Sequence, residues 1–181
     1  MKKNVTKIFS RKQISQIAIA YSKGSYTYHD FITQYPNCSQ HQFYTILHLS
    51  VDKAIVSEQI ARKIQNVAVV SSLQKVEETC SDPYYIEAIQ RRVFNSWERR
   101  IKSLQYFCFS KTEAKRLVDA YSNSSLSKKD FCIQNCIATK LFERTVIEAV
   151  ILNWVSDKCF DRLYSKALAA NDPDKVEHLF S

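Results

Sequence analysis

The sequence predicts an all-α protein built from two copies of one helical unit joined by a central helix. Three observations lead to this fold class: few chain breakers, an internal repeat, and a capping signal at the start of almost every expected helix. Among 181 residues there are one Gly (Gly24) and three Pro. Hairpin turns favour Asn-Gly and Asp-Gly pairs, and neither pair occurs here. Helices joined by short polar turns are therefore expected.

The internal repeat begins at residue 9. Residues 9–35 recur 100 positions later, and a one-residue deletion in the next turn shifts the remaining matches to an offset of 99. Thirteen residues are identical over roughly 55 positions, where chance gives about three. The duplication is therefore taken as real. The matching pairs include Phe9 and Phe109, Tyr21 and Tyr121, Phe31 and Phe131, Phe43 and Phe142, Val51 and Val150, and Ser57 and Ser156.

Capping signals mark the helix starts. A Ser or Thr cap follows an apolar residue and is followed by a polar residue at the third helical position, as in a capping box with its hydrophobic staple. In the first copy these signals predict helices of about 10–22, 27–35, 39–54 and 57–80, which begin at Ser10, Thr27, Ser39 and Ser57. In the second copy Ser110, Ser127 and Ser156 repeat the caps. Ala138 replaces the third cap and cannot accept a hydrogen bond.

Two further local signals complete the helical prediction. Gly24 suits the left-handed position that ends the first helix. Asp82-Pro83 supplies an N-cap and a proline at the first helical position, which predicts a helix running to about residue 104. We expect the arginines of this helix to form a solvated face. The predicted organisation is residues 1–80 as the first unit, 81–108 as a connecting helix and 109–181 as the second unit.

The second and third helices of each copy have the dimensions of a helix-turn-helix. In the first copy a short helix over 27–35 is followed by the three-residue turn Pro36-Asn37-Cys38 and a capped helix from Ser39. In such motifs the second helix lies in the DNA major groove. The residues expected to contact DNA are Ser39, Gln40, His41, Tyr44, Thr45 and His48 in the first copy, and Thr139, Lys140 and Arg144 in the second.

The two outward faces predict different roles. A Gln can pair with adenine, a Thr can contact a thymine methyl group, and Ser or Tyr hydroxyls can reach phosphates. The second copy has no cap at Ala138 and carries Glu143 beside its cations. We expect the first copy to contact base edges, and the second to contact the DNA backbone or to support dimerisation as a homodimer.

The stretch from Ser25 to Tyr44, with its short helix, turn and Ser-x-x-x-Phe-Tyr start, resembles the helix-turn-helix segments of resolvase- and transposase-type DNA-binding proteins. The whole chain is also similar to uncharacterised two-repeat proteins from phages and conjugative elements of Gram-positive bacteria. One departure is that Asn37, or Asn135-Cys136, stands where many such motifs place Gly; Asn tolerates the left-handed region. The resemblance implies a sequence-preferring regulator or accessory factor of a mobile element.

The charge of the chain agrees with a polyanionic partner. The formal net charge is +8 and the sequence pI is about 9.2. Residues 1–64 carry nine Lys or Arg against three Asp or Glu, and such an excess releases counterions from phosphates. The alternative is a solubilising charge without a target. Neither a membrane-spanning run nor a signal peptide is visible, so a cytoplasmic protein is expected.

Catalytic, metal and cofactor sites are not expected. Cys132 and Cys136 stand four apart, but no Cys-x-x-Cys and no adjacent His supports a zinc site. One Gly cannot make a phosphate-binding loop. The six cysteines are expected to be reduced and mostly buried.

A rival hypothesis comes from another class of protein. Small basic helical proteins of phages can inhibit a host or defence protein, with a helix-turn-helix body as the interaction surface. The interface anchors would then be exposed aromatic side chains. The candidates are Tyr28, Tyr44, Tyr84 and Tyr85. A helical bundle that touches no DNA, and RNA binding, remain further alternatives.

Overall fold

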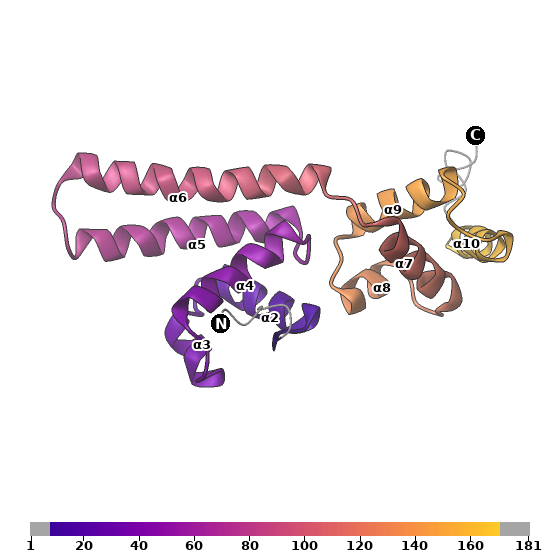
Figure 1. The fold of residues 1–181 in the computed structure, drawn as a ribbon, viewed down its shortest axis with the longest axis horizontal. Helices are drawn as coiled ribbons and strands as arrows, with labels where there is room; N and C mark the ends of the chain where they lie inside the picture. The colour runs from indigo at the N-terminus through magenta and orange to yellow at the C-terminus, as the bar shows by residue number, and fades with distance from the viewer. Residues whose placement is uncertain (1–7, 171–181) are drawn as a thin grey trace. The chain divides into compact units, whose positions relative to one another are not determined.

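A computed structural model of the chain describes residues 8–170, and all its regular secondary structure is helical (Figure 1). The predicted all-α class is confirmed. The chain divides into two compact units, and the boundary lies between Phe107 and Cys108 in the sequence. Residues 1–7 of the expected first unit and 171–181 of the expected second unit lie outside the described residues.

The first unit combines a three-helix body with a long helical hairpin (Figure 1). Its helices are α2 (Arg11–Ser22), α3 (Tyr28–Gln34), α4 (Gln40–Asp52), α5 (Glu58–Glu77) and α6 (Pro83–Ser103), followed by a short 3₁₀ helix, η1 (Leu104–Tyr106). Helix α2 packs on both α4 and α5, and α6 packs along α5 and against α4. The first four helices lie within a few residues of the ranges predicted from the caps.

The second unit repeats the first four helices without the long hairpin. Its helices are α7 (Lys111–Asn123), α8 (Lys128–Asn135), α9 (Thr139–Ile151) and α10 (Asp157–Ala169). Helix α7 packs against both α9 and α10, and α8 packs on α9. Helix α10 is 13 residues long, whereas its counterpart α5 has 20.

The predicted caps are present. Complete capping boxes begin α2, α3 and α4, and the hydroxyls of Ser57, Ser110, Ser127 and Ser156 each accept a backbone N–H of their helix. Ala138 makes no side-chain cap, as expected. Each cap satisfies a donor that the helix itself leaves unpaired, so the helix boundaries follow from local sequence.

Backbone conformation supports the duplication and corrects one expectation. Ala54 and Asn153, which are equivalent residues, both adopt the left-handed region with φ of 47° and 52°. Gly24 is left-handed as predicted, with φ of 77°. In the turns, however, Asn37 does not have a positive φ, and the left-handed residue of the second turn is Cys136 (φ 52°) rather than Asn135. The first turn therefore has no left-handed residue, although its Asn suggested one.

The two units also share an aromatic core. In the first unit the ring of Phe43 lies 5.7 Å from Tyr21 and 5.0 Å from Phe31, between centroids. In the second, the rings of Tyr121, Phe131 and Phe142 lie 5.2–5.3 Å apart. The repeated aromatic residues therefore form the same packing twice, and they hold the first three helices of each unit together.

The expected connecting helix belongs to the first unit. Trp97 and Ile101 of α6 are buried, and the Arg100 guanidinium pairs with the Asp52 carboxylate at the end of α4. The loop between α5 and α6 is short, so the two helices become antiparallel neighbours. Helix α6 therefore packs within the first unit, whereas the sequence suggested a separate connecting helix.

Among residues 8–170, no helix combines the length and the apolar character needed to cross a membrane.

Candidate nucleic-acid interface

The start of α4 presents two polar side chains to solvent. The Ser39 hydroxyl accepts the Gln42 N–H at 3.2 Å, and the Gln42 side-chain oxygen accepts the Ser39 N–H at 2.7 Å. This reciprocal pair fixes the first turn of the helix. Gln40 and His41 are exposed on that turn. Of the residues predicted to contact DNA, these two and Ser39 lie together at an accessible helix start.

Thr45 is placed differently. Its hydroxyl donates to the His41 carbonyl at 2.8 Å and the side chain is half-buried. Its donor is therefore occupied within the helix.

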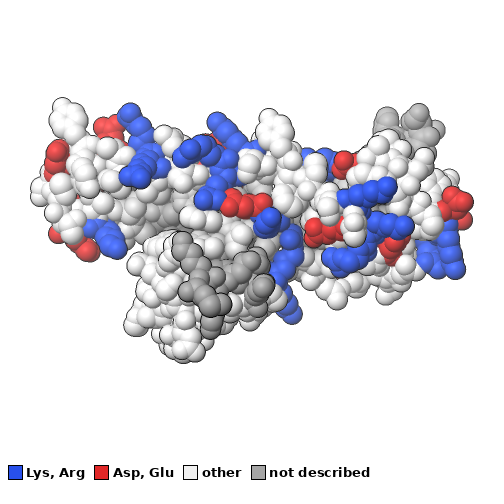
Figure 2. Space-filling model, viewed as in Figure 1, with Lys and Arg blue, Asp and Glu red and all other residues white. Residues whose placement is uncertain are grey.

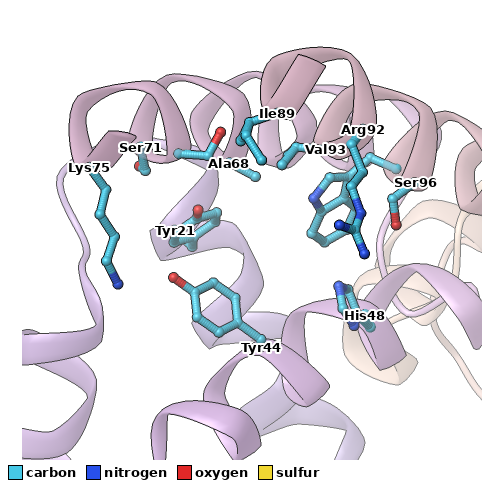
Figure 3. Close-up of a pocket in the computed structure, with 12 residues that line it drawn as sticks. Tyr21, Tyr44, His48, Ala68, Ser71, Lys75, Ile89, Arg92, Val93 and Ser96 are labelled. Atoms are coloured by element: carbon cyan, nitrogen blue, oxygen red, sulfur yellow. The ribbon is translucent and has the colours of Figure 1, made fainter. Parts of the chain in front are cut away.

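Tyr44 and His48 face the α5–α6 hairpin instead of the open side of α4. The His48 ring packs edge-on against Trp97, with centroids 5.0 Å apart. Burial is the main reason why the pKa of His48 is lowered; nearby Arg100 contributes in the same direction and Asp52 opposes it. Both residues line a pocket formed with α5 and α6 (Figure 3). Tyr44 nevertheless keeps 40% of its surface exposed, so the predicted outward position is wrong only for His48, which is half-buried because α6 folds back over α4.

The second unit presents cations at the equivalent helix. Thr139, Lys140 and Arg144 are exposed on α9, and the last two stand four residues apart, so they share one side of the helix. Glu143, expected on the outward face, forms an ion pair with Lys128 of α8. The repulsion of phosphate expected from its carboxylate is therefore offset within the unit.

The distribution of charge differs between the two helix-turn-helix segments. Between Lys23 and Lys53 the first unit has no Lys or Arg, and the face of this region seen in Figure 2 shows none. Three of the basic residues behind the predicted N-terminal excess lie outside the described residues. They are Lys2, Lys3 and Lys7. In the second unit, exposed cations lie on all three corresponding helices: Lys111, Lys115 and Arg116 on α7, Lys129 on α8, and Lys140 and Arg144 on α9.

Exposure is confirmed for three of the four aromatic candidates, one of which is Tyr44 at 40%. Tyr84 is 85% exposed and Tyr85 is 52% exposed at the start of α6. Tyr28 is half-buried, with its ring 6.0 Å from that of Phe43. It is part of the aromatic core, so it cannot serve as a surface anchor.

The cysteines are reduced, but fewer are buried than predicted. Cys132 and Cys159 are buried, three are half-buried, and Cys108 is exposed. Burial raises the pKa of the Cys132 thiol to about 11, which keeps it protonated at neutral pH. Within residues 8–170, no cluster of three His, Cys, Asp or Glu side chains could hold a metal ion.

Sequence reasoning missed the pocket between α4 and the α5–α6 hairpin. Its cations are Lys75 and Arg92, and it has a volume of about 390 Å³. These residues are brought together only when α6 packs along α5. The usable signal in the sequence was the apolar face of α6, which requires a helix to pack against.

Comparison of the chain with protein-family models, with curated proteins and with solved structures gave no match.

Proposed function

We propose that this protein binds duplex DNA through its two helix-turn-helix units. The observation that carries the proposal is the pair of equivalent, exposed helix starts: α4 presents Gln40 and His41, and α9 presents Lys140 and Arg144. Gln and His side chains can hydrogen-bond base edges, while Lys and Arg neutralise phosphates. In this proposal the first unit supplies sequence preference and the second supplies most of the affinity.

The charge distribution supports these different roles of the two units in DNA binding. Phosphate contacts dominate the affinity of DNA-binding proteins, and no cation lies between Lys23 and Lys53 of the first unit. The second unit carries exposed cations on α7, α8 and α9. Linking the two units on one chain raises the effective concentration of the second site once the first is bound. A weakly binding unit that contacts bases can therefore act beside one that holds the backbone.

The resemblance of residues 25–44 to resolvase- and transposase-type segments suggests a regulator or accessory factor of a mobile element. Selection from a random duplex library tests the proposal. We expect one enriched motif with the wild-type chain, and loss of enrichment when Gln40 and His41 are both changed to Ala. The control is Lys158→Ala, which removes an exposed cation of α10 outside the helix-turn-helix and should leave the motif unchanged. Absence of any enriched motif with the wild-type chain contradicts the proposal.

A second candidate, binding to a protein partner, is favoured by an apolar surface on the second unit. Ile147 and Ile151 are 37% and 66% exposed, and they stand four residues apart on α9, so they share one side of the helix. Exposed apolar groups of this size are typical of interaction sites when they form a patch. A photo-crosslinking residue at position 151 should then capture one protein saturably, whereas the same residue at position 158 should not. Equal labelling from both positions contradicts this candidate.

A further inference from the structure

The pocket of the first unit has the size of a small-molecule site. It lies where α4 faces the α5–α6 hairpin, and its volume is about 390 Å³ (Figure 3). Ligand pockets begin at roughly 300 Å³. Its walls come from four helices, α2, α4, α5 and α6, so its shape depends on the fold of the whole unit.

Aromatic rings form much of the wall. The rings of Trp97 and His48 meet edge-on at one end, with centroids 5.0 Å apart. On another side, the hydroxyl end of Tyr44 points toward the Tyr21 ring (Figure 3). Aromatic side chains pack favourably against another ring in offset or edge-on geometry. The walls therefore suit a planar aromatic group.

The charged groups of the lining are both cationic. Lys75 comes from α5 and Arg92 from α6, and none of the twelve lining residues is Asp or Glu. Within residues 8–170, neither cation forms an ion pair with an acidic side chain. His48 adds no charge at neutral pH, because burial lowers its pKa further below neutrality. Figure 3 shows the two cations on opposite sides of Tyr44, so an anionic group beside Arg92 would meet one positive side chain and no acidic side chain of the lining.

We propose that this pocket binds a small planar aromatic anion, with its ring against Tyr44 and its negative group on Arg92. A guanidinium is suited to a carboxylate because it can donate two parallel hydrogen bonds. The ligand class follows from the lining alone, so the inference stands independently of DNA binding by the same chain.

The test is a titration of the full chain with 1-naphthoate, followed by the Trp97 indole N–H signal in ¹H–¹⁵N NMR spectra. The Trp154→Phe variant identifies which of the two indole signals belongs to Trp97. We expect a saturable shift of the Trp97 signal. The uncharged analogue 1-naphthalenemethanol should bind about tenfold more weakly, because it lacks the negative charge that Arg92 would pair with.

The variant Arg92→Gln should weaken naphthoate binding by about tenfold. The matched control is Arg91→Gln, which removes the neighbouring arginine of α6; Arg91 pairs with Glu87 at 2.7 Å and does not line the pocket. The control should bind as the wild type does. The proposal is overturned if the Trp97 signal does not shift saturably over the soluble range of naphthoate, if the alcohol binds equally well, or if the two variants weaken binding to the same extent.

Discussion

The two units share their first four helices and differ in what covers the outer side of α4 and α5 and of their counterparts α9 and α10. In the first unit α6 lies over α4 and α5, and the covered positions are polar and paired: His48 meets Trp97, Asp52 pairs with Arg100, and Gln65 donates to the Phe94 carbonyl at 3.2 Å. The equivalent residues of the second unit are Ile147, Ile151 and Tyr164, which are all exposed to at least 37%.

This contrast teaches that the duplicated part is the set of four capped helices, while the residues on their outer side differ between a covered and an uncovered unit. Polar side chains are tolerated under α6 because each finds a partner there. The exposed apolar side chains of the second unit have no helix of that kind over them within residues 108–170. The pocket lies on the side of the first unit that α6 covers. The exposed apolar side chains lie on the corresponding uncovered side of the second unit.

The largest expected effect on stability comes from substitutions in the aromatic core that both units share. Phe43→Ala and Phe142→Ala each remove a fully buried ring, and each should cost about 3–5 kcal/mol of the free energy of unfolding of its own unit. Trp97 reports on the first unit and Trp154 on the second, so denaturation can be followed separately in Trp154→Phe and Trp97→Phe backgrounds. If each variant shifts both transitions equally, the units do not have separate cores.

A smaller effect should distinguish the covered side from the open one. Gln65 is buried and its side-chain amide also donates to Glu98 at 3.3 Å. Gln65→Ala removes a buried side chain with its hydrogen bonds to the Phe94 carbonyl and Glu98, and should cost about 1–3 kcal/mol. The equivalent Tyr164→Ala alters an exposed side chain and should cost at most about 1 kcal/mol. Equal losses in denaturant unfolding would remove the contrast between the two surfaces.

The smallest effect concerns pH. The pKa of His48 is lowered in the folded unit, so the unfolded chain takes up a proton first as the pH falls. The first unit should therefore lose stability as the pH drops below about 6.5, down to the folded pKa, and hold its full His48 contribution above that window. In denaturation of the unit monitored by Trp97, stability should be constant above about pH 7.5 and should fall as the pH is lowered through about 6.5.

The change His48→Gln supplies the control for this pH effect. It keeps a polar side chain but removes the titrating group, so the pH dependence attributable to His48 should disappear. A pH dependence that is identical in the variant means that other groups cause it.

Local structure could be predicted from the sequence, and long-range packing could not. The helix starts at Ser10, Thr27 and Ser39 follow from hydrogen bonds within four residues, and the left-handed Gly24 follows from its lack of a side chain. The fold-back of α6 depends on contacts such as Trp97 with His48, which are 49 residues apart. The apolar periodicity of residues 83–103 predicts an apolar side of α6. It does not identify the helix against which that side packs.

The same limit explains the candidate site. Gln40 and His41 were placed correctly on an exposed helix start, because that depends on the cap and the helical wheel. His48 was misplaced, because the helix that covers it comes from a distant segment of the sequence. Lys75 and Arg92 of the pocket were not found, because they belong to two different helices that the sequence analysis did not pair.

The most direct test of the central claim is the salt dependence of binding to the selected duplex. We predict that Lys140→Ala and Arg144→Ala each lower the slope of log K against log salt concentration by about one unit. The Gln40→Ala, His41→Ala double variant should keep the slope and lose its preference for the selected duplex over a scrambled one. Unchanged slopes in the α9 variants, together with an unchanged preference in the α4 variant, would contradict DNA binding through these two helix starts.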